Sequence, residues 1–599
     1  MISVSKAYKD ATKKPIRQSY VTIKYGLFNK EAKQEVSGFF STGLQRFSSL
    51  SNVVDETKES VYNYISCEPN RVRLDNNFVF VENKGSLNIN QNVGAWNNEL
   101  SNADGKLETR PIFQLRFNKV MAFIPLTLHF QEVIKKMLIS YMLNKKVVHN
   151  EVVKDNDQLT IETASLDNES PTQYFDTIQF TFYETKEPYR YVKLNEVDFG
   201  AYKTFNASEI KEFNIIEEIS LDNDTLPSNS LNATIIDNNG SYDLLNPNSK
   251  LKKLKNGQEL SITHHLKVGN VFKEVVLGTF LLKKVSSENM RLKLECYDEL
   301  YFMNSTYYGS KFYNDEKATN IFQDLFDHFN YVNTRYSFDP ELENVRLTGY
   351  VPNVEFREAL RLIAESCKAI IKKNRTGGIY IFKAKESEVY ANFFSKSDYV
   401  NEHIKENLYN NTIDVKVYSY DRIEEDTLYS SKMSRGTYNI SFSKYPLVYD
   451  EYKDNPNYES LKSGDIGNYK IKSINANGCQ IEVTQDNTQV EIKGKYYVET
   501  FINERVRLEK NTDVDESAIT KIDNHLITSN NYYDIAKWKL NKSNISYELE
   551  YKTTPYIEVG DKCKIQTKYK DINGNFITKD FVTTKIEYDH TIMQRIKGE

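Results

Sequence analysis

Phe113-Gln114-Leu115-Arg116-Phe117-Asn118 and Ile178-Gln179-Phe180-Thr181-Phe182 are the stretches that decide the fold class. In both, apolar and polar side chains alternate, which is the period of a strand with one buried face. Leu292-Lys293-Leu294-Glu295-Cys296 repeats the pattern. Asn-Gly pairs at 239–240, 256–257, 477–478 and 573–574 suit tight hairpin turns, because both residues tolerate positive φ. The chain is therefore predicted to be mainly β with antiparallel connections.

Three segments follow a helical period instead. Residues 317–329 carry one apolar stripe, and residues 354–371 carry another that includes Cys367. The third helix is predicted at 530–540, with Ser529 as its N-cap. The first two helices and a strand at 379–382 indicate a small α+β domain over 311–400. Polar stretches at 150–171 and 450–465 are predicted to be loops.

Composition bounds the possible functions. The chain has 599 residues, enough for about four domains. Its formal net charge of −5 provides no strong field for phosphate backbones, so nucleic-acid binding is not expected. The apolar window at 120–126 is far shorter than the roughly 20 residues that cross a bilayer, and we expect a soluble chain without a membrane segment, made in a cytoplasm.

The sequence contains no pattern typical of a metal site or of a disulfide framework. The five cysteines are widely dispersed, with no CxxC pair. His264 and His265 are neighbours within an alternating strand pattern, so their side chains point to opposite faces and cannot chelate one ion together. Residues 237–243 offer oxygen ligands at alternate positions, but the glycine and the closing glutamate of a calcium loop are misplaced or missing, which favours a hairpin turn.

Enzyme signatures are equally weak. Glycosidases need two carboxylates held about 5–10 Å apart across a sugar. Glu217-Glu218 and Glu424-Glu425-Asp426 have the right residue types, but adjacent acids are more often solvated charges. Trp96 could be a sugar-stacking platform, although a buried sandwich tryptophan is the more frequent role. We therefore predict no catalytic, cofactor-binding or metal-ligating residues, and a chain that is not an enzyme.

Residues 210–310 carry a series of short motifs in a recognisable order and spacing. These are Glu217-Glu218-Ile219-Ser220-Leu221, Leu226-Pro227-Ser228-Asn229-Ser230-Leu231, the 237–247 turn region, Leu277-Gly278-Thr279-Phe280 and Leu294-Glu295-Cys296-Tyr297-Asp298-Glu299-Leu300. In this order they resemble the first β-barrel of bacteriophage tail-hub proteins, also called baseplate-hub or tail-tip proteins. Residues 17–25 are similar to the first strand of that barrel.

The resemblance extends over nearly the whole chain and is weakest between 400 and 520. Motifs near 64–70, 74–76, 96–101 and 188–200 are similar to the lectin-like β-sandwich of hub proteins from phages and prophages of Gram-positive bacteria or phage-tail-like bacteriocins. Residues 555–565 are similar to the closing hairpin of the second hub barrel. The resemblance implies two tube-type β-barrels, an inserted lectin-like β-sandwich and a small α+β domain. The implied boundaries are 1–45 and 201–310 for barrel 1, 46–200 for the sandwich, 311–400 for the α+β domain, and 401–599 for barrel 2.

The function implied by this resemblance is structural. A homotrimer would form a ring that joins the sixfold tail tube, or a distal tail protein, to a central spike, needle or tape-measure protein within the baseplate of a virion or a contractile injection particle. Two alternatives stay open: a carbohydrate-binding host-recognition protein that uses residues 46–200 to hold host-surface glycans, and a tail-associated wall hydrolase.

Overall fold

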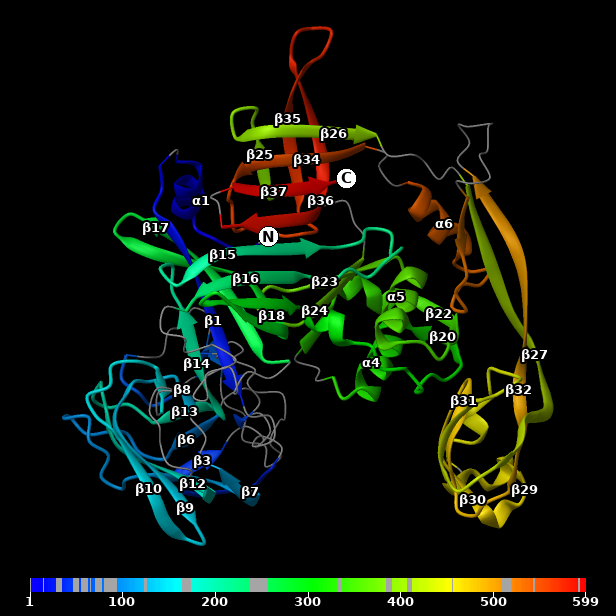
Figure 1. Ribbon diagram of the computed structural model, residues 1–599, viewed down its shortest axis with the longest axis horizontal. Helices are drawn as coiled ribbons and strands as arrows, with labels where there is room; N and C mark the ends of the chain where they lie inside the picture. The colour runs from blue at the N-terminus through cyan, green and yellow to red at the C-terminus, as the bar shows by residue number, and fades with distance from the viewer. Residues whose placement is uncertain are drawn as a thin grey trace. The chain divides into compact units, whose positions relative to one another are not determined.

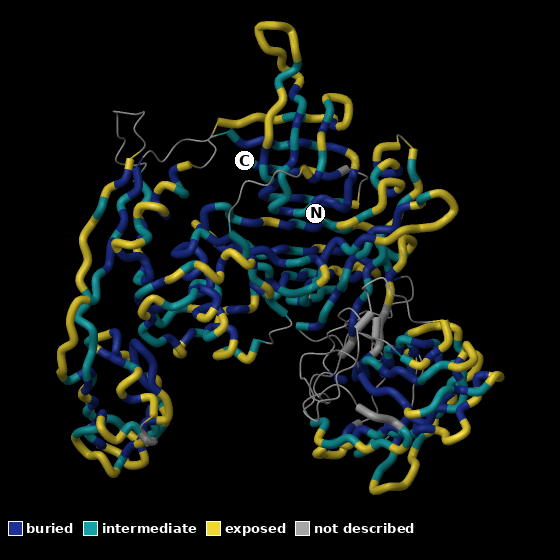
Figure 2. Tube along the Cα trace, turned by 180° about the vertical axis from the view of Figure 1, so that it is seen from behind, coloured by how far each residue is buried: buried dark blue, intermediate teal, exposed yellow. Residues whose placement is uncertain are grey.

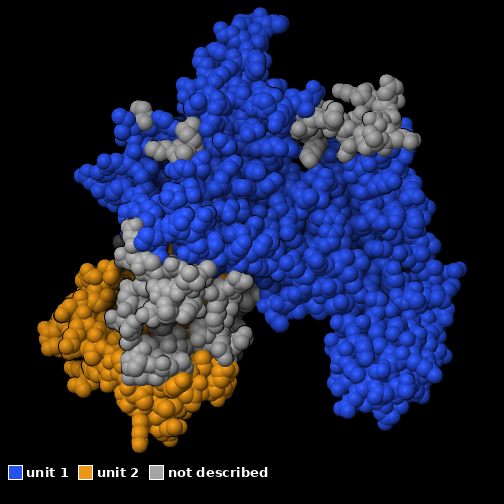
Figure 3. Space-filling view, in the orientation of Figure 1, with its two compact units in different colours: residues 1–22, 206–237, 261–599 blue, residues 23–205, 238–260 orange. Residues whose placement is uncertain are grey.

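The computed structural model describes the chain except for residues 1, 15, 29–34, 47–52, 55–62, 65, 71–77, 80–93, 123–125, 164–173, 238–256, 332–334, 384–389, 407–411, 455, 508–518, 542–544 and 591–592. The chain divides into two compact units (Figure 3). Unit 1 comprises residues 1–22, 206–237 and 261–599, and unit 2 comprises residues 23–205 and 238–260. The prediction of a mainly β chain is confirmed, since strands make up most of the elements (Figure 1).

The largest sheet has 13 strands, most of which belong to unit 1. Its path is β14 (Gly200–Phe205), β1 (Ser19–Phe28), β17 (Glu259–Val268), β18 (Val271–Glu288), β19 (Arg291–Tyr297), β16 (Ser230–Ile236), β15 (Ile210–Glu218), β36 (Phe576–Asp589), β37 (Met593–Gly598), β34 (Ile545–Lys552) and β26 (Tyr399–Glu406); β35 (Lys562–Lys570) pairs with β36, and β25 (Asn392–Phe394) pairs with β35. Helix α1 (Lys6–Lys13) precedes β1 and begins after Ser5, whose side chain accepts from the Tyr8 amide.

Apart from β14 at one end of the path, this sheet contains two groups of six strands. We call β1, β17, β18, β19, β16 and β15 strand set 1, and β36, β37, β34, β26, β35 and β25 strand set 2. Set 1 draws on the residues predicted for barrel 1, and set 2 on those predicted for barrel 2 together with the preceding β25. Strand β19 shows why these residues form strands, because Leu292, Leu294 and Cys296 are buried while the side chains between them are more exposed.

Residues 299–383 form an α+β region of unit 1. Its elements are η2 (Glu299–Phe302), β20 (Tyr313–Lys317), α4 (Ala318–His328), β21 (Tyr336–Phe338), η4 (Pro340–Asn344), β22 (Arg346–Gly349), α5 (Phe356–Ser366), β23 (Ala369–Lys373) and β24 (Ile379–Lys383). The predicted stripe of the first helix is buried in the core of this region. The second helix is shorter than predicted, because Lys368 adopts φ of 55° and the chain then continues as β23.

Residues 412–540 form a long insertion between β26 and β34 of strand set 2. A two-stranded ribbon of β27 (Thr412–Met433) and β32 (Thr488–Arg507) runs between two small cores. Around it lie β28 (Gly436–Ser441), η5 (Tyr449–Glu451), η6 (Pro456–Leu461), β29 (Lys462–Gly464), η7 (Ile466–Asn468), β30 (Tyr469–Asn475), β31 (Gly478–Val483), β33 (Ile519–Ile522) and α6 (Tyr532–Leu540). The predicted loop at 450–465 therefore contains two short helices and a strand. Helix α6 is capped at Asn531 rather than at the predicted Ser529.

Unit 2 is built on two five-stranded antiparallel sheets that share one core. One sheet has the order β10 (Lys146–Val153), β9 (Ile134–Leu143), β12 (Tyr174–Thr185), β7 (Ile112–Ala122) and β2 (Val36–Thr42); the other has β11 (Thr160–Glu162), β8 (Thr127–Phe130), β13 (Lys193–Asp198), β6 (Ala95–Asn97) and β3 (Leu44–Arg46), and β4 (Asn63–Tyr64) pairs with β5 (Phe78–Val79). Strands β2 and β3 lie on the N-terminal side of the boundary predicted at residue 46. Strand β11 interrupts the predicted loop at 150–171.

Two further features of the described residues bear on the sequence analysis. In the hairpin between β30 and β31, Gly478 does not occupy a positive-φ turn position; a Cβ atom there would lie 2.0 Å from the Ile440 carbonyl oxygen, so close strand approach requires the glycine. Gly574, by contrast, has φ of 81° in the turn before β36, as predicted. No helix among the described residues is long and apolar enough to cross a membrane.

Candidate assembly interface

The two strand sets meet where β15 pairs with β36. The strands are antiparallel, with register from Asn214 opposite Asp589 to Glu218 opposite Lys585. The Ile219 amide extends the ladder by donating to the Thr584 carbonyl at 2.9 Å. Strand sets separated by hundreds of residues in sequence are thereby joined edge to edge into one sheet. We call this pairing, together with the side chains buried against it, the seam.

Arg375 binds the α+β region to the seam. It lies in the turn between β23 and β24, and its guanidinium donates from Nε to Glu217 Oε1 at 2.5 Å and from Nη2 to Glu217 Oε2 at 2.7 Å. Nη2 also donates to the Ile557 carbonyl at 2.7 Å and to the Tyr588 hydroxyl at 2.6 Å, and Nη1 donates to the Pro555 carbonyl. Three separate parts of unit 1 therefore converge on one side chain.

The two charged side chains of this arrangement are buried, so each charge depends on the other for its stabilisation. The side chains of Arg375 and Glu217 are only 2% and 3% exposed. Burial alone would lower the pKa of Arg375, but the neighbouring Glu217 charge outweighs it, and the pKa lies well above its ordinary value. Burial also raises the pKa of Tyr588. The group is a fully hydrogen-bonded structural ion pair, because both oxygens of Glu217 are engaged by the guanidinium.

The prediction of a solvated charge is wrong for Glu217 and confirmed for Glu218. Glu217 is buried on the same side of β15 as Ile215, whereas Glu218 is exposed. Strand alternation already placed these neighbours on opposite faces, so one of them had to point inward. No sequence signal identified the partner, because Arg375 lies 158 residues away. The other acidic run, at 424–426, is exposed as predicted.

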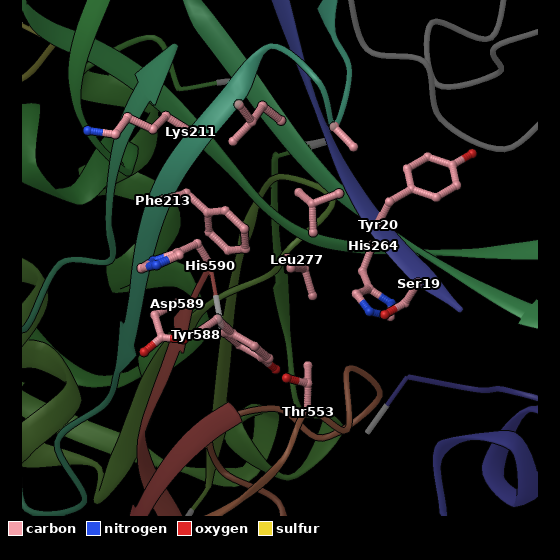
Figure 4. Close-up of a pocket in the computed structure, with 13 residues that line it drawn as sticks. Ser19, Tyr20, Lys211, Phe213, His264, Leu277, Thr553, Tyr588, Asp589 and His590 are labelled. Atoms are coloured by element: carbon pink, nitrogen blue, oxygen red, sulfur yellow. The ribbon is translucent and has the colours of Figure 1, made fainter. Parts of the chain in front are cut away.

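The histidine pair lies on opposite sides of β17, as predicted. His265 stacks on Tyr20 with ring centroids 4.4 Å apart, and its Nε2 lies 2.9 Å from the Thr22 hydroxyl. His264 instead lines a cavity together with Phe213 and Leu277 (Figure 4). Both imidazoles are buried. The two side chains therefore have separate surroundings, and they do not form a common metal site.

Trp96 and the loop at 237–243 complete the set of predicted candidates. Trp96 is buried at 7% exposure, and the Lys193 ammonium lies 4.7 Å from its ring centroid. Its face is therefore occupied within unit 2 rather than open to a sugar. Only Asp237 of the 237–243 loop lies within the described residues, and its amide donates to the Met290 carbonyl at 2.9 Å.

One group within the described residues has the side chains of a metal site. His129 on β8 lies opposite Glu196 on β13, and Asp198 follows on the same strand. Their ligand atoms all lie within 4.8 Å of one another, and both carboxylates are buried. His129 Nε2 lies 2.9 Å from Asp198 Oδ2, so a hydrogen bond already joins two of the three. The sequence missed this group because its members come from two strands far apart in the chain. The five cysteines are free.

No family model matches the sequence, and no curated protein does. Among solved structures it is similar to a tail protein from Neisseria meningitidis, with a TM-score of 0.38, 8% identity, and coverage of 66% of this chain and 93% of that chain. A 43 kDa tail protein of prophage MuSo2 from Shewanella oneidensis gives a TM-score of 0.38, 9% identity, and coverage of 66% and 94%. A prophage tail protein from Listeria monocytogenes gives a TM-score of 0.32, 10% identity, and coverage of 66% and 90%. These proteins are what the chain is similar to; at such scores they do not establish its family.

Proposed function

We propose that this chain is a structural baseplate or tail hub protein, which forms a trimeric ring joining a sixfold tail tube to a central spike or tail tip. The observation that carries the proposal is the seam. Two sets of six strands are joined edge to edge within one chain. Three such chains in a ring would present six strand sets, which matches the symmetry of a sixfold tube. The motif order described above supports the same function.

The free edge of strand set 2 suggests how the copies would join. Within the described residues, β26 ends the sheet path and pairs only with β34. Val400 and Ile404 on β26 are 61% and 37% exposed. An edge strand with exposed apolar side chains is a template for pairing with another strand. We assign this edge to β14 of a second copy, because β14 ends the same sheet path on the side of strand set 1.

The test is the stoichiometry of the assembled protein. Electron microscopy of the particle, or native mass spectrometry of the recombinant full chain, should show three copies around one axis. Val400→Lys on β26 should abolish the ring and leave a folded monomer. Val147→Lys on β10, an edge strand of the sandwich where Val147 is 51% exposed, is the matched control and should leave the ring intact. Six copies, or a monomer at the particle periphery, would refute the hub proposal.

The partners follow from the same proposal. The ring would contact the tail tube or a distal tail protein on one side, and the spike, needle or tape-measure protein on the other, with other baseplate proteins around it.

We further propose that the chain is not catalytic. Incubation of the pure protein with peptidoglycan from several bacterial walls should release no muropeptides above background, and release of such fragments would refute this part of the proposal.

The sandwich is proposed to be an autonomous insertion between the two parts of barrel 1. Strands β2 and β3 pair with β7 and β6, so a fragment that begins at residue 36 retains two strands that a fragment beginning at 46 loses. We expect residues 36–205 to melt cooperatively and residues 46–200 to be less stable. An aggregated 36–205 fragment without a cooperative melt would contradict the proposal. The alternative of carbohydrate binding has less support, because the Trp96 face is covered.

A further inference from the structure

A cavity of about 240 Å³ lies within unit 1, next to the seam (Figure 4). Its wall combines apolar side chains, including Val21, Phe213 and Leu277, with polar groups such as Ser19 and His264. Its volume is sufficient for a small organic group rather than a single water molecule. The two charged side chains in the lining, Lys211 and Asp589, have opposite signs and offset one another.

His264 brings an unsatisfied polar atom to this cavity. The residue is 6% exposed, and its Nδ1 atom is buried without a hydrogen-bond partner. Burial and the nearby charge of Arg17 lower the pKa of His264 to about 3, so the imidazole is neutral at physiological pH. Buried polar atoms are nearly always hydrogen-bonded in folded proteins. A neutral imidazole with a free ring nitrogen is therefore available to a ligand.

Arg17 adds a half-buried cation for which the described residues provide no ion pair. Its Nη1 donates to the Thr12 carbonyl at 2.8 Å, whereas Nε and Nη2 are buried and have no hydrogen-bond partner within the part of the chain that the structure describes. The Gln18 carbonyl accepts from the Lys267 amide at 3.0 Å, so the pairing of β1 with β17 continues up to this residue. Arg17 precedes β1 and is not among the lining residues, but strand alternation places it on the side of Ser19 and Val21, which do line the cavity. The hydroxyl of Tyr8, a 2% exposed residue of α1, is likewise buried without a partner.

Charge and shape together define the kind of ligand that this site would bind. A buried guanidinium without a partner is costly, because desolvation is not repaid by any opposite charge. Adjacent N–H groups of a guanidinium match the two oxygens of a carboxylate. Since Lys211 and Asp589 offset one another, Arg17 leaves a single positive charge, which suits a monoanion better than a phosphate dianion. The apolar wall suits a short hydrocarbon chain.

We propose that Arg17 and His264 form a binding site for a carboxylate carried on a short aliphatic chain. Such a carboxylate belongs either to a free aliphatic acid or to an acidic side chain of a neighbouring copy of this protein. In both cases the carboxylate oxygens accept from Arg17, and the hydrocarbon part lies against Val21 and Leu277. The cavity adjoins the seam, since Tyr588 lines it and also accepts from Arg375. Binding of a free acid does not depend on the proposed ring.

Calorimetric titration of the full chain with sodium butyrate tests the site. We expect saturable binding and a raised melting temperature, with neither effect from 1-butanol, which has no carboxylate. Arg17→Gln should weaken butyrate binding at least about tenfold, as expected for loss of a charged hydrogen-bond donor. Arg422→Gln, at an exposed arginine on β27, is the matched control and should bind like the wild type. His264→Leu should also weaken binding, whereas Arg17→Lys should bind with intermediate affinity.

The two sources of the carboxylate are separated by mass measurement. If the acid comes from a neighbouring copy, butyrate and Arg17→Gln should each lower the mass of the assembled protein in sedimentation. If the acid is free, the mass should not change. Absence of saturable butyrate binding to the wild type would overturn the proposal, as would unchanged binding by a folded Arg17→Gln protein. Near-ultraviolet circular dichroism establishes whether each variant is folded. If Arg17→Gln does not fold, Arg17→Lys, which retains the charge, takes its place in the binding measurement.

Discussion

The seam and the β27–β32 ribbon contain the same kind of ion pair in opposite surroundings. At the seam, Arg375 holds Glu217 through two hydrogen bonds, of 2.5 and 2.7 Å. On the ribbon, Arg505 holds Asp414 through two of 2.6 and 2.8 Å. The seam side chains are 2% and 3% exposed, whereas the ribbon side chains are 43% and 24% exposed. Nearly equal geometry therefore coexists with very different solvation.

The difference shows that burial, rather than hydrogen-bond length, decides what an ion pair does in this protein. In the ribbon, Asp414 and Arg505 are directly opposed cross-strand neighbours, and water solvates either group when its partner is lost. Residues 421–426 of the ribbon are exposed in an unbroken run (Figure 2). At the seam, the loss of one partner leaves the other charged and buried, so the pair specifies how three parts of the chain must fit together.

The largest expected effect is at the seam. Arg375→Ala leaves Glu217 buried without its counter-ion and should lower the free energy of unfolding by about 3–5 kcal/mol. Urea denaturation followed by circular dichroism measures the change. Glu217→Gln and the double variant complete a cycle, in which the double variant should be less destabilised than the sum of the single variants. A loss below about 1 kcal/mol in Arg375→Ala would place the seam pair in the same class as the ribbon pair.

A core substitution in the α+β region separates packing from charge. Phe322 is fully buried in α4, and its ring centroid lies 5.7 Å from that of Phe338. Phe322→Ala should cost about 3–5 kcal/mol because it leaves a cavity in the core. Unlike the loss in Arg375→Ala, this loss should simply add to that of Glu217→Gln. Denaturation of the single and double variants tests the distinction, and Phe393→Ala, at an exposed phenylalanine of β25, is the control.

The pH dependence of the free energy of unfolding should come from His264 on β17 rather than from the ribbon. His264 has a pKa of about 3 in the folded chain and an ordinary value of about 6.5 when unfolded. Below about pH 6.5 the unfolded chain therefore binds a proton that the folded chain does not, so stability falls as the pH decreases. At about pH 4.5 this contribution amounts to about 2–3 kcal/mol relative to pH 7.

His264→Leu should remove that part of the pH dependence. Denaturation curves at several pH values, in buffers free of carboxylates, compare the slope of the variant with that of the wild type. His403→Leu, at an exposed histidine of β26, should retain the wild-type slope. If His264→Leu and the wild type lose stability in parallel between pH 7 and about 4.5, the imidazole is already protonated in the folded chain.

The smallest expected effect is on the ribbon. Arg505→Ala should change the free energy of unfolding by less than about 1 kcal/mol, because exposed ion pairs gain little over their hydration. The remaining effect should disappear at high salt, where solvent ions screen the charges. Chemical denaturation with and without added salt is sufficient. A loss as large as that of Arg375→Ala would show that the ribbon pair is covered in the protein studied, for instance by another chain.

The sequence by itself determined the local structure. Alternation of apolar and polar residues predicted the strands, and the helical stripe of 317–329 predicted α4 and its buried face. Both follow from backbone geometry, because the period of a pattern reports which side chains share a face. Errors occurred at the ends of elements. Helix α5 stops where Lys368 takes a positive φ, although no glycine or proline marks that position.

Only the tertiary structure decided which faces and edges meet. Alternation showed that one of Glu217 and Glu218 points inward, but not that Arg375 would lie opposite it. The pairing of β15 with β36, the grouping of His129 with Glu196 and Asp198, and the cavity beside His264 all join residues far apart in the chain. A strand pattern specifies the orientation of side chains and leaves the identity of the neighbouring strand open. The long-range packing that selects this neighbour also sets the burial that makes a charged residue structural or solvated.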